Sequence, residues 1–588
     1  MQNPRWVFNL ILVFTSFSSL VRSSFSSSPV CSTQDRDALL SFKGSIVKDT
    51  TGILSSWSGV DCCDGGWEGV DCNPATGRVI SLQLQRPQNG EAGSGVFMQG
   101  SLSPSLGNLQ FLEVMVVSGM KQINGFIPGS LSKLTHLTQL YLEDNMLQGP
   151  IPSSLGELVS LKALSLSGNQ LQGQLPPSLG SISGLLQINV GKNHLVGSVP
   201  SAFKDLHSLQ SLDLSYNLFS GGIPSFVGQL QNLTFLDLSH NQFSGGMPLA
   251  LCSLSNVLDV SLSHNKLVGE IPTQIGKLRS LNTLDLSSNL LGGAIPESFG
   301  LLQKLWYLNI SRNELSGSLP NGLANGLPSL LSVDLSYNKL EIETMPDWLR
   351  SRDLRDVHLA GCNIKGALKP FTKPGSLNSI DLSDNYVTGG ISQLFTSMTS
   401  LQVVKLSNNL LSSSISEIFF PNGLSFLDLH SNQFYGSIPA RINKLKLLQF
   451  LDLSSNKITG ELPEFGEGTS LKWLDLSRNG INGQIPSSIS KLSELQRLNL
   501  SRNQLKGTIP SSVGLMVRLE WLDLSSNGVI GRIPDSFKGL VNIKHVSLRN
   551  NRLCGEIPQQ KPFNIFPAAA YAHNLCLCGQ PLPPCRKI

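Results

Sequence analysis

Leucines and other large apolar residues recur along this chain at fixed intervals and alternate locally with polar residues. From Asn145 to Asn551 the phrase Leu-x-Leu-x-x-Asn-x-Leu-x-Gly-x-Ile-Pro, or a close variant, returns eighteen times, about every 24 residues. Residues 140–152 and 522–534 are two clear copies that lie far apart. Because successive side chains of a strand point to opposite faces, each Leu-x-Leu predicts a short strand with buried leucines and outward-facing residues between them.

This period and this spacing of leucine and asparagine are typical of a leucine-rich repeat solenoid. We therefore predict an α/β repeat fold: a curved, right-handed solenoid whose short parallel strands line its concave face. Two irregular copies, near residues 82–100 and 114–128, precede the regular ones, and the first contains an insertion at 88–97. We expect about twenty repeats within residues 79–553, because a repeat array can lengthen without a second core.

The other repeated letters have structural explanations. The asparagine amide can donate to backbone groups of its own turn and of the neighbouring coil. Glycine supplies unusual backbone dihedrals, and proline tolerates a turn position at which no N–H is needed. Segments such as residues 153–158, Ser-Ser-Leu-Gly-Glu-Leu, are expected to build the outer side of each coil.

The N-terminus predicts a secretory signal peptide over residues 1–23. Arg5 precedes an apolar run from Trp6 to Val21, and small residues follow at Ser23 and Ser24. An N-terminal membrane anchor is the alternative, but the run is short and contains serine, threonine and asparagine. No other segment approaches 18 continuous apolar residues. We therefore expect the mature protein to be soluble and secreted, without a membrane span.

Composition argues against several classes of function. Charged residues make up 14% of the chain and the formal net charge is +4, with no stripe of lysine and arginine. This balance gives no support for binding nucleic acid or an anionic membrane. We find no phosphate loop, zinc-binding helix, nucleophile elbow or paired redox cysteines, so we expect no enzyme activity and no cofactor.

Eight of the ten cysteines lie at the two ends of the chain, which predicts disulfide-stapled caps over residues 24–78 and 554–588. A solenoid needs caps because its first and last coils leave an apolar face bare. Residues 32–44 predict a cap helix over the first coil. Three pairings are possible within each group of four, and a zinc site at Cys576 and Cys578 is disfavoured by their spacing. The end cysteines are Cys31, Cys62, Cys63, Cys72, Cys554, Cys576, Cys578 and Cys585.

Two cysteines lie inside repeats. Cys252 and Cys362 are expected to be buried free thiols, and Cys362 stands where other repeats have asparagine.

The residues that should face the concave side form columns when the strands stack. Six residues before the repeat asparagine, six consecutive coils carry aromatic or cationic residues, which are favoured at protein interfaces. We predict that these residues bind the partner: Phe426, Phe450, Trp473, Arg497, Trp521 and His545. Beside them, four before the asparagine, lies a mostly acidic column that matches the repeat consensus and is therefore expected to be structural: Asp428, Asp452, Asp475, Asn499, Asp523 and Ser547.

Three N-glycosylation sequons are present, at Asn232, Asn309 and Asn499. Asn309 and Asn499 fall between strand leucines and should face the concave side. A glycan on Asn499 would lie within the proposed binding column. Either that sequon is unoccupied, or the partner docks beside the sugar, or the column is not the site.

One stretch departs from the repeat. From Glu341 to Phe420 the Gly-x-Ile-Pro phrase is degraded, for example to Glu341-Ile-Glu-Thr-Met-Pro346. Sequence drift in a tolerant outer turn explains this. The other possibilities are a local change in superhelical twist or a partner-binding flank.

Several segments together resemble plant-type extracellular leucine-rich repeat proteins. The Leu-x-Gly-x-Ile-Pro turn is their hallmark, and residues 35–43, 54–57, 61–63 and 67–72 look like their N-terminal cap. Residues 551–558 and 577–582 look like their C-terminal cap. The resemblance implies pairing of Cys31 with Cys62, Cys63 with Cys72, Cys554 with Cys576, and Cys578 with Cys585.

Within this family the chain is similar to polygalacturonase-inhibitor-like proteins, which have about half as many coils, and to the ectodomains of receptor-like proteins and kinases. Residues 95–100 and 120–125 look like a plant group that bears a DNA-damage-toleration name. A non-basic solenoid gives that name no physical support.

The resemblance implies a secreted, non-catalytic protein of the cell wall or apoplast that binds a protein or peptide, such as a receptor kinase, in defence or in receptor-complex signalling. The alternative is inhibition of a microbial hydrolase of the polygalacturonase type. A third hypothesis, a structural protein that binds wall polysaccharide such as pectin, calls for a basic concave stripe, and the aspartate column opposes it.

Overall fold

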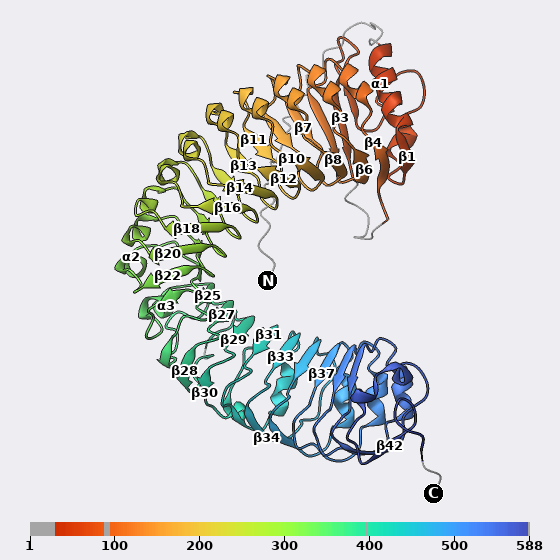
Figure 1. Ribbon diagram of the computed structural model, residues 1–588, viewed down its shortest axis with the longest axis vertical. Helices are drawn as coiled ribbons and strands as arrows, with labels where there is room; N and C mark the ends of the chain where they lie inside the picture. Colours follow the sequence, from red (N-terminus) through yellow and green to blue (C-terminus); the bar gives the residue numbers. More distant parts are fainter. Residues whose placement is uncertain (1–29, 87–94, 396, 586–588) are drawn as a thin grey trace, which may run out of the picture.

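The computed structural model describes residues 30–86, 95–395 and 397–585. The predicted signal peptide and most of the insertion at 88–97 lie outside the described residues. Figure 1 shows the coils stacked in an open arc, with α1 (Thr33–Gly44) at one end and β42 (Cys576–Cys578) at the other. Among the described helices, none has the length and apolar character needed to cross a membrane.

The concave face is a sheet of short strands that pair with the next coil in parallel, as the Leu-x-Leu spacing predicts. In most coils the middle residue of the strand is buried and its neighbours are half-buried, for example Phe235, Leu236 and Asp237 in β15. An antiparallel strand, β2 (Val70–Cys72), covers the N-terminal edge. The twenty parallel strands are β3 (Val79–Gln85), β5 (Val114–Ser118), β7 (Gln139–Tyr141), β9 (Ala163–Ser165), β11 (Gln187–Asn189), β13 (Ser211–Asp213), β15 (Phe235–Asp237), β17 (Asp259–Ser261), β19 (Thr283–Asp285), β21 (Tyr307–Asn309), β23 (Ser332–Asp334), β25 (Asp356–His358), β27 (Ser379–Asp381), β29 (Val403–Lys405), β31 (Phe426–Asp428), β33 (Phe450–Asp452), β35 (Trp473–Asp475), β37 (Arg497–Asn499), β38 (Trp521–Asp523) and β40 (His545–Ser547).

The repeated asparagines form a ladder of buried side chains. In Asn217 the Nδ2 group donates to the carbonyl oxygens of Val190, one coil earlier, at 2.9 Å and of Leu214 at 3.2 Å. Its Oδ1 accepts the N–H of Leu195 at 3.0 Å. Each asparagine therefore binds two coils together and satisfies backbone groups that no strand pairs.

A second set of strands follows the repeat asparagine, where the sequence analysis expected only a turn. The run x-Leu-x-Gly is extended and pairs from coil to coil along the side of the arc, and the glycine ends it with a positive φ, as at Gly245 (75°). These lateral strands are β1 (Ile46–Asp49), β4 (Met98–Ser101), β6 (Lys121–Gly125), β8 (Met146–Gly149), β10 (Gln170–Gly173), β12 (His194–Gly197), β14 (Leu218–Gly221), β16 (Gln242–Gly245), β18 (Lys266–Glu270), β20 (Leu290–Ala294), β22 (Glu314–Gly317), β24 (Lys339–Leu340), β26 (Lys365–Ala367), β28 (Tyr386–Gly389), β30 (Leu410–Leu411), β32 (Tyr435–Gly436), β34 (Lys457–Glu461), β36 (Gly480–Asn482), β39 (Ile530–Gly531), β41 (Arg552–Glu556) and β42.

The lateral sheet is interrupted inside the degraded stretch. Its first part runs from β1 to β24, and a separate sheet begins at β26. Within the described residues, β24 pairs with β22 alone. Further breaks follow β30 and β36.

The outer side of most coils is a short 3-10 helix that begins after the turn proline. Close stacking there requires glycine: a Cβ on Gly228 would lie 2.1 Å from the carbonyl oxygen of Ala250 in the next coil. Two outer segments are α-helical instead, α2 (Asn321–Asn325) and α3 (Asp347–Ser351). The 3-10 helices are η1 (Ile53–Ser56), η2 (Pro104–Asn108), η3 (Gly129–Lys133), η4 (Ser153–Glu157), η5 (Pro177–Ser181), η6 (Ser201–Asp205), η7 (Ser225–Gln229), η8 (Leu249–Ser253), η9 (Ile275–Lys277), η10 (Glu297–Leu301), η11 (Ile415–Glu417), η12 (Ala440–Lys444), η13 (Ser487–Lys491), η14 (Ser511–Leu515), η15 (Asp535–Gly539), η16 (Phe563–Ile565) and η17 (Ala568–Ala570).

Both ends are closed by disulfide-bonded caps. In the N-terminal cap α1 covers the first coil, and its fully buried Asp35 pairs with Arg78 at 2.8 Å. Trp57 and Trp67 stack behind this helix with ring centroids 5.5 Å apart. The disulfides join Cys31 to Cys62, Cys63 to Cys72, Cys554 to Cys576, and Cys578 to Cys585, the same pairs that the family resemblance implies.

The two remaining cysteines are free and buried. Cys362 takes over part of the asparagine ladder, because its thiol lies 3.5 Å from the carbonyl oxygens of Leu335 and Ala360. Burial raises the pKa of the Cys362 thiol to about 12 and that of Cys252 to about 11, so both are poor nucleophiles.

Candidate ligand-binding surface

The six predicted partner-binding residues form one column on the concave face of the C-terminal arm. The strand register places each of them directly beside the next, from Phe426 in β31 to His545 in β40. All six are half-buried. We call these residues, Phe426, Phe450, Trp473, Arg497, Trp521 and His545, the aromatic column.

The rings of the aromatic column stack face to face. Phe426 and Phe450 have centroids 4.1 Å apart with planes inclined by 5°, and Trp521 and His545 are 3.5 Å apart at 13°. Phe450 continues the stack to Trp473 at 5.2 Å. Because these faces lie against one another, the column offers a partner mainly ring edges.

Arg497 joins the two halves of the stack. Its guanidinium lies 4.1 Å from the ring centroid of Trp473 and 4.3 Å from that of Trp521, a double cation–π contact. Within the described residues it forms no ion pair. The Nε1 atoms of both tryptophans and the Nε of Arg497 are buried and have no hydrogen-bond acceptor there. The centre of the column is therefore rich in donors that no described acceptor uses.

Charges at the two ends of the column differ. Lys405 lies 5.7 Å from the centroid of Phe426 and pairs with Asp381 at 3.4 Å. At the other end, burial and the nearby Arg497 lower the pKa of His545, against the opposing effect of Asp523. His545 is therefore neutral at neutral pH, and the positive charge of the stack resides on Arg497.

The neighbouring acidic column is bound into the backbone. The Oδ1 atom of Asp475 accepts the N–H of Ser477 at 3.0 Å and its hydroxyl at 2.6 Å. Asp452 and Asp523 accept the corresponding N–H two residues later at 2.9 and 2.8 Å. Asp452 and Asp523 thus keep their second oxygen for other partners, whereas that of Asp475 accepts the Nδ2 group of Asn499.

The three sequons lie in different settings. Asn232 is exposed on the outer side, where its Nδ2 donates to the carbonyl oxygen of His207 at 2.8 Å. Asn309 and Asn499 face the concave side in β21 and β37. The Nδ2 of Asn499 donates to Asp475 at 2.7 Å, within the surface that the aromatic column occupies.

A cluster that the sequence analysis missed lies beside the column. The Nδ1 of His430 lies 2.7 Å from Asp428, and a hydrogen bond to this carboxylate raises the pKa of the imidazole. Together with Asp452, these residues place three potential metal-ligand atoms within 4.8 Å of one another. The sequence contained a signal for this cluster, because His430 occupies the position that serine holds in most repeats.

A second histidine joins aspartate and serine across three strands. His358 Nε2 lies 2.9 Å from Ser379 Oγ, and its Nδ1 lies 3.8 Å from Asp334. Burial lowers the pKa of His358, but the hydrogen bond to Asp334 and the charges of Asp334, Asp381 and Asp356 together raise it by more, so the net shift is upward. Ser379 is only 5% exposed and its N–H donates to Arg355 within the sheet. Acyl transfer by a serine nucleophile also needs free N–H groups that converge on the oxyanion. The N–H of Ser379 is not free, because it is hydrogen-bonded within the sheet.

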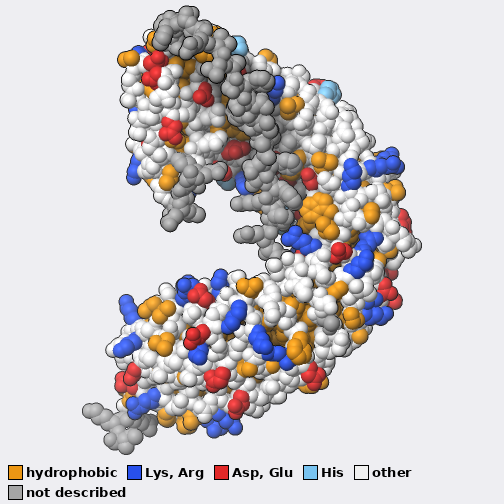
Figure 2. Space-filling view, turned by 180° about the vertical axis from the view of Figure 1, so that it is seen from behind, with side chains coloured by type: hydrophobic (Ala, Val, Ile, Leu, Met, Phe, Trp, Pro, Cys, Tyr) orange, Lys and Arg blue, Asp and Glu red, His pale blue; other side chains and the backbone are white. Residues whose placement is uncertain are grey.

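Surface charge agrees with a protein-binding role. Figure 2 shows lysine, arginine, aspartate and glutamate side chains interspersed over the C-terminal arm. Mixed charge of this kind does not form the single-sign field that nucleic acid requires.

The fold and this surface define a class, a capped leucine-rich repeat solenoid with an open concave sheet. Three family descriptions match the chain: a leucine-rich repeat region at 95–244, a leucine rich repeat N-terminal domain at 32–73, and leucine rich repeats at 255–315, 446–505 and 469–529. The chain belongs to the plant extracellular leucine-rich repeat proteins.

Several curated relatives match part of the chain. The DNA damage-repair/toleration protein DRT100 of Arabidopsis thaliana is 34% identical over 143 residues, which cover 24% of this chain and 36% of that protein. A polygalacturonase inhibitor of Vitis vinifera is 34% identical over 113 residues, which cover 19% of this chain and 30% of the inhibitor. The matched part thus spans about a third of each relative.

Several solved structures match most of the chain. The ectodomain of the receptor kinase GASSHO1/SCHENGEN3 from Arabidopsis thaliana, in complex with CASPARIAN STRIP INTEGRITY FACTOR 2, has a TM-score of 0.77 at 34% identity, covering 89% of this chain and 62% of that one. The Arabidopsis receptor kinase HAESA, in complex with the peptide hormone IDA and the co-receptor SERK1, has a TM-score of 0.63 at 31% identity, covering 95% and 100%.

Proposed function

We propose that this chain is a non-catalytic extracellular binding protein that holds a peptide or protein ligand on the aromatic column, in defence or in receptor-complex signalling. The observation that carries the proposal is the continuous stack of six side chains across six coils. Stacked aromatic and arginine side chains form rigid contact surfaces, which lose little conformational entropy when a ligand binds. The likeness to ectodomains solved with a peptide hormone supports the same class of ligand.

The column also indicates what the ligand presents. Ring edges carry partial positive charge and the guanidinium of Arg497 carries a full one, so carbonyl oxygens and carboxylates suit this surface. An extended peptide laid across the strands offers carbonyl oxygens at regular intervals. Beside the column, the second carboxylate oxygens of Asp452 and Asp523 favour donors.

Affinity capture from plant cell-wall extract tests the proposal, with the wild type and the variant Trp473→Ala/Trp521→Ala run in parallel. Tyr307→Ala is the control, since Tyr307 holds the same strand position in β21 outside the column. We expect proteins or peptides that the wild type and the control retain and the double variant loses. Equal recovery by all three, with equal circular dichroism spectra, would refute the column as the site.

Peptide mapping of the secreted protein adds an independent check. Asn499 lies in β37 two residues after Arg497, so an attached glycan would cover the middle of the column. If Asn499 carries a glycan and capture of the partner is undiminished, the binding site lies elsewhere on the protein.

The second candidate function is inhibition of microbial polygalacturonases, which the likeness to the grapevine inhibitor favours. A panel of these hydrolases assayed with added protein separates the two. Dose-dependent inhibition supports the inhibitor, and uninhibited rates across the panel support the peptide-binding or receptor-complex role. Binding of wall polysaccharide is the third candidate, and the aspartates beside the column oppose it for anionic pectin.

A further inference from the structure

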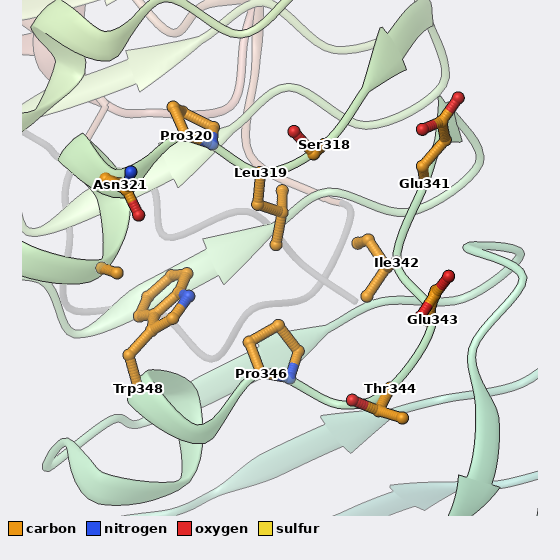
Figure 3. A pocket seen from close by; sticks show the side chains of 11 residues that line it. Ser318, Leu319, Pro320, Asn321, Glu341, Ile342, Glu343, Thr344, Pro346 and Trp348 are labelled. Atoms are coloured by element: carbon orange, nitrogen blue, oxygen red, sulfur yellow. The ribbon is translucent and has the colours of Figure 1, made fainter.

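A hollow of about 490 Å³ lies on the outer flank of the arc, at the start of the degraded stretch. It opens between the coil that contains α2 and the coil that contains α3. Figure 3 shows Leu319, Pro346 and Trp348 around its middle, with Glu341 and Glu343 together at one end. We call this hollow the flank groove.

The flank groove lies where the repeat changes length. Turn prolines from Pro128 to Pro320 are spaced by eight intervals of 24 residues, whereas Pro320 and Pro346 are 26 residues apart. One extra residue lies before Asn338 and one after it. The longer coil folds its outer segments as α2 and α3, and the side chains of the two coils leave a space between them.

The walls of the groove are firmly placed. Arg352 donates to the carbonyl oxygens of Ala324 and Leu327 at 2.9 Å, and its guanidinium lies 5.1 Å from the ring centroid of Trp348. Ile342 is 4% exposed and forms part of the floor. The indole therefore stands against a fixed cation on one side and contributes to the groove on the other.

The rim of the groove is acidic and unpaired. Glu341 and Glu343 are exposed, and neither forms an ion pair with a described residue. The nearby Lys339 is held by Glu314. Glu341, Ile342 and Glu343 thus alternate exposed acid, buried apolar residue and exposed acid, which is the pattern of a strand with one buried face.

The backbone here is also open to pairing. Glu341 donates its N–H to Gly317 at 2.9 Å, and the carbonyl oxygen of Glu343 accepts from Lys365 at 2.8 Å. The N–H groups of Ile342, Glu343 and Thr344 have no acceptor among the described residues. Free backbone N–H groups of this kind can donate to the carbonyl oxygens of a partner peptide.

We infer that the flank groove is a docking site for an extended segment of a partner protein with the pattern basic, apolar, basic. Opposite residues of paired strands share a face, so the apolar side chain enters the groove beside Ile342 and Trp348. The two lysine or arginine side chains then lie against Glu341 and Glu343. This site is separate from the aromatic column and does not depend on the function proposed for it.

Photo-crosslinking with a defined probe tests the inference. The probe is acetyl-Gly-Lys-photoleucine-Lys-Gly-amide, irradiated with the full chain, and mass spectrometry locates the adducts. We expect adducts on residues 318–321 or 342–348. Removing both charges in Glu341→Gln/Glu343→Gln should lower their yield about two- to thirtyfold, as two cross-strand charge pairs imply.

Two controls separate this site from nonspecific attraction. Glu461→Gln removes an exposed glutamate from a regular lateral strand, β34, and should leave the yield unchanged. A probe with glutamate in place of both lysines should label the groove at least about fivefold less. Adducts mainly on the concave aspartates, or equal yields for the wild type and the double variant, would overturn the inference.

Discussion

Replacing one buried asparagine with alanine measures how strongly the asparagine ladder binds the coils together. Asn289 is 6% exposed in a regular coil. Its Nδ2 donates to Leu262 of the preceding coil at 2.9 Å and to Leu286 at 3.1 Å, with Ser287 sharing a proton at 3.2 Å. Its Oδ1 accepts the N–H of Leu267 at 3.0 Å.

The expected magnitude follows from these contacts. Two donated protons and one accepted proton make three hydrogen bonds, each with a net contribution of about 0.5–1.5 kcal/mol. Alanine also leaves the buried N–H of Leu267 without an acceptor, which costs about 1–3 kcal/mol. These contributions sum to ~2.5–7.5 kcal/mol, so we expect Asn289→Ala to destabilise its coil by at least ~2.5 kcal/mol, the upper end of the usual effect of a point mutation or more.

Two comparisons calibrate this value. Asn256 is exposed and makes one bond, to Gln231 at 2.9 Å, so Asn256→Ala should change stability by less than ~1 kcal/mol. Cys362 fills the ladder position with a weaker donor, while Asn385 accepts the N–H groups of Cys362 and Ile364 at 3.1 and 2.9 Å. Cys362→Ala should therefore cost only ~1 kcal/mol, because no N–H loses its acceptor.

The assay must be local, since coils of a repeat array can open separately. Hydrogen exchange with mass spectrometry over residues 258–291 gives the free energy of local opening, and a thermal melt by circular dichroism gives the global change. Protection in Asn289→Ala within about 1 kcal/mol of that in Asn256→Ala would refute the ladder as a major source of stability.

Three further predictions concern single features. Burial, with the charge of Asp213, raises the pKa of Asp237 to about 6, above its unfolded value of about 3.9. The protonated side chain of Asp237 therefore stabilises the fold below pH 4, and this contribution is lost as pH rises through 6. Asp237→Asn should therefore raise the free energy of unfolding by ~1–3 kcal/mol at pH 7 and leave it unchanged at pH 4. Equal changes in the free energy of unfolding at the two pH values would contradict this. Arg497→Lys should weaken local protection of β37 by ~0.5–1 kcal/mol, because an ammonium cannot stack between two indoles, and unchanged protection would remove the cation–π account. Serine at Cys554 and Cys576 should lower protection of residues 545–579 by ~2–4 kcal/mol and leave residues 163–213 unaffected, whereas loss in both regions would contradict local capping.

The concave face could be predicted from the sequence because a constant repeat length fixes the register. Once Leu427 and Leu451 are assigned to the same strand position, Phe426 and Phe450 must be neighbours, and the structure pairs them so. The stacking of these rings could not be predicted from the sequence, because ring orientation depends on side-chain torsions that the repeat does not specify. The sequence thus predicted which residues are neighbours in each column. It did not predict that the ring faces contact one another within the column.

Features formed between coils were harder to predict. The lateral strands have only two to five residues each, and their hydrogen bonds join residues about 24 positions apart, so no local pattern marks them. The degraded stretch was recognised from Glu341 onward, yet Leu319 and Pro320 of the preceding, regular coil form half of the flank groove. A change in the length of one coil alters the space between it and its neighbour. Inspection of one repeat sequence at a time does not reveal this space.

The solenoid architecture makes the two proposed surfaces independent of each other. Each coil contacts its neighbours only, so a substitution at Glu341 affects packing within about one coil on either side. The aromatic column begins at Phe426, four strands beyond β23 of the groove's second coil. Additivity is the rule for sites this far apart, so Glu341→Gln/Glu343→Gln and Trp473→Ala/Trp521→Ala should each abolish one binding event and leave the other intact. A ligand on the concave face and a partner on the flank can then be held at once, an arrangement suited to a protein that brings two others together.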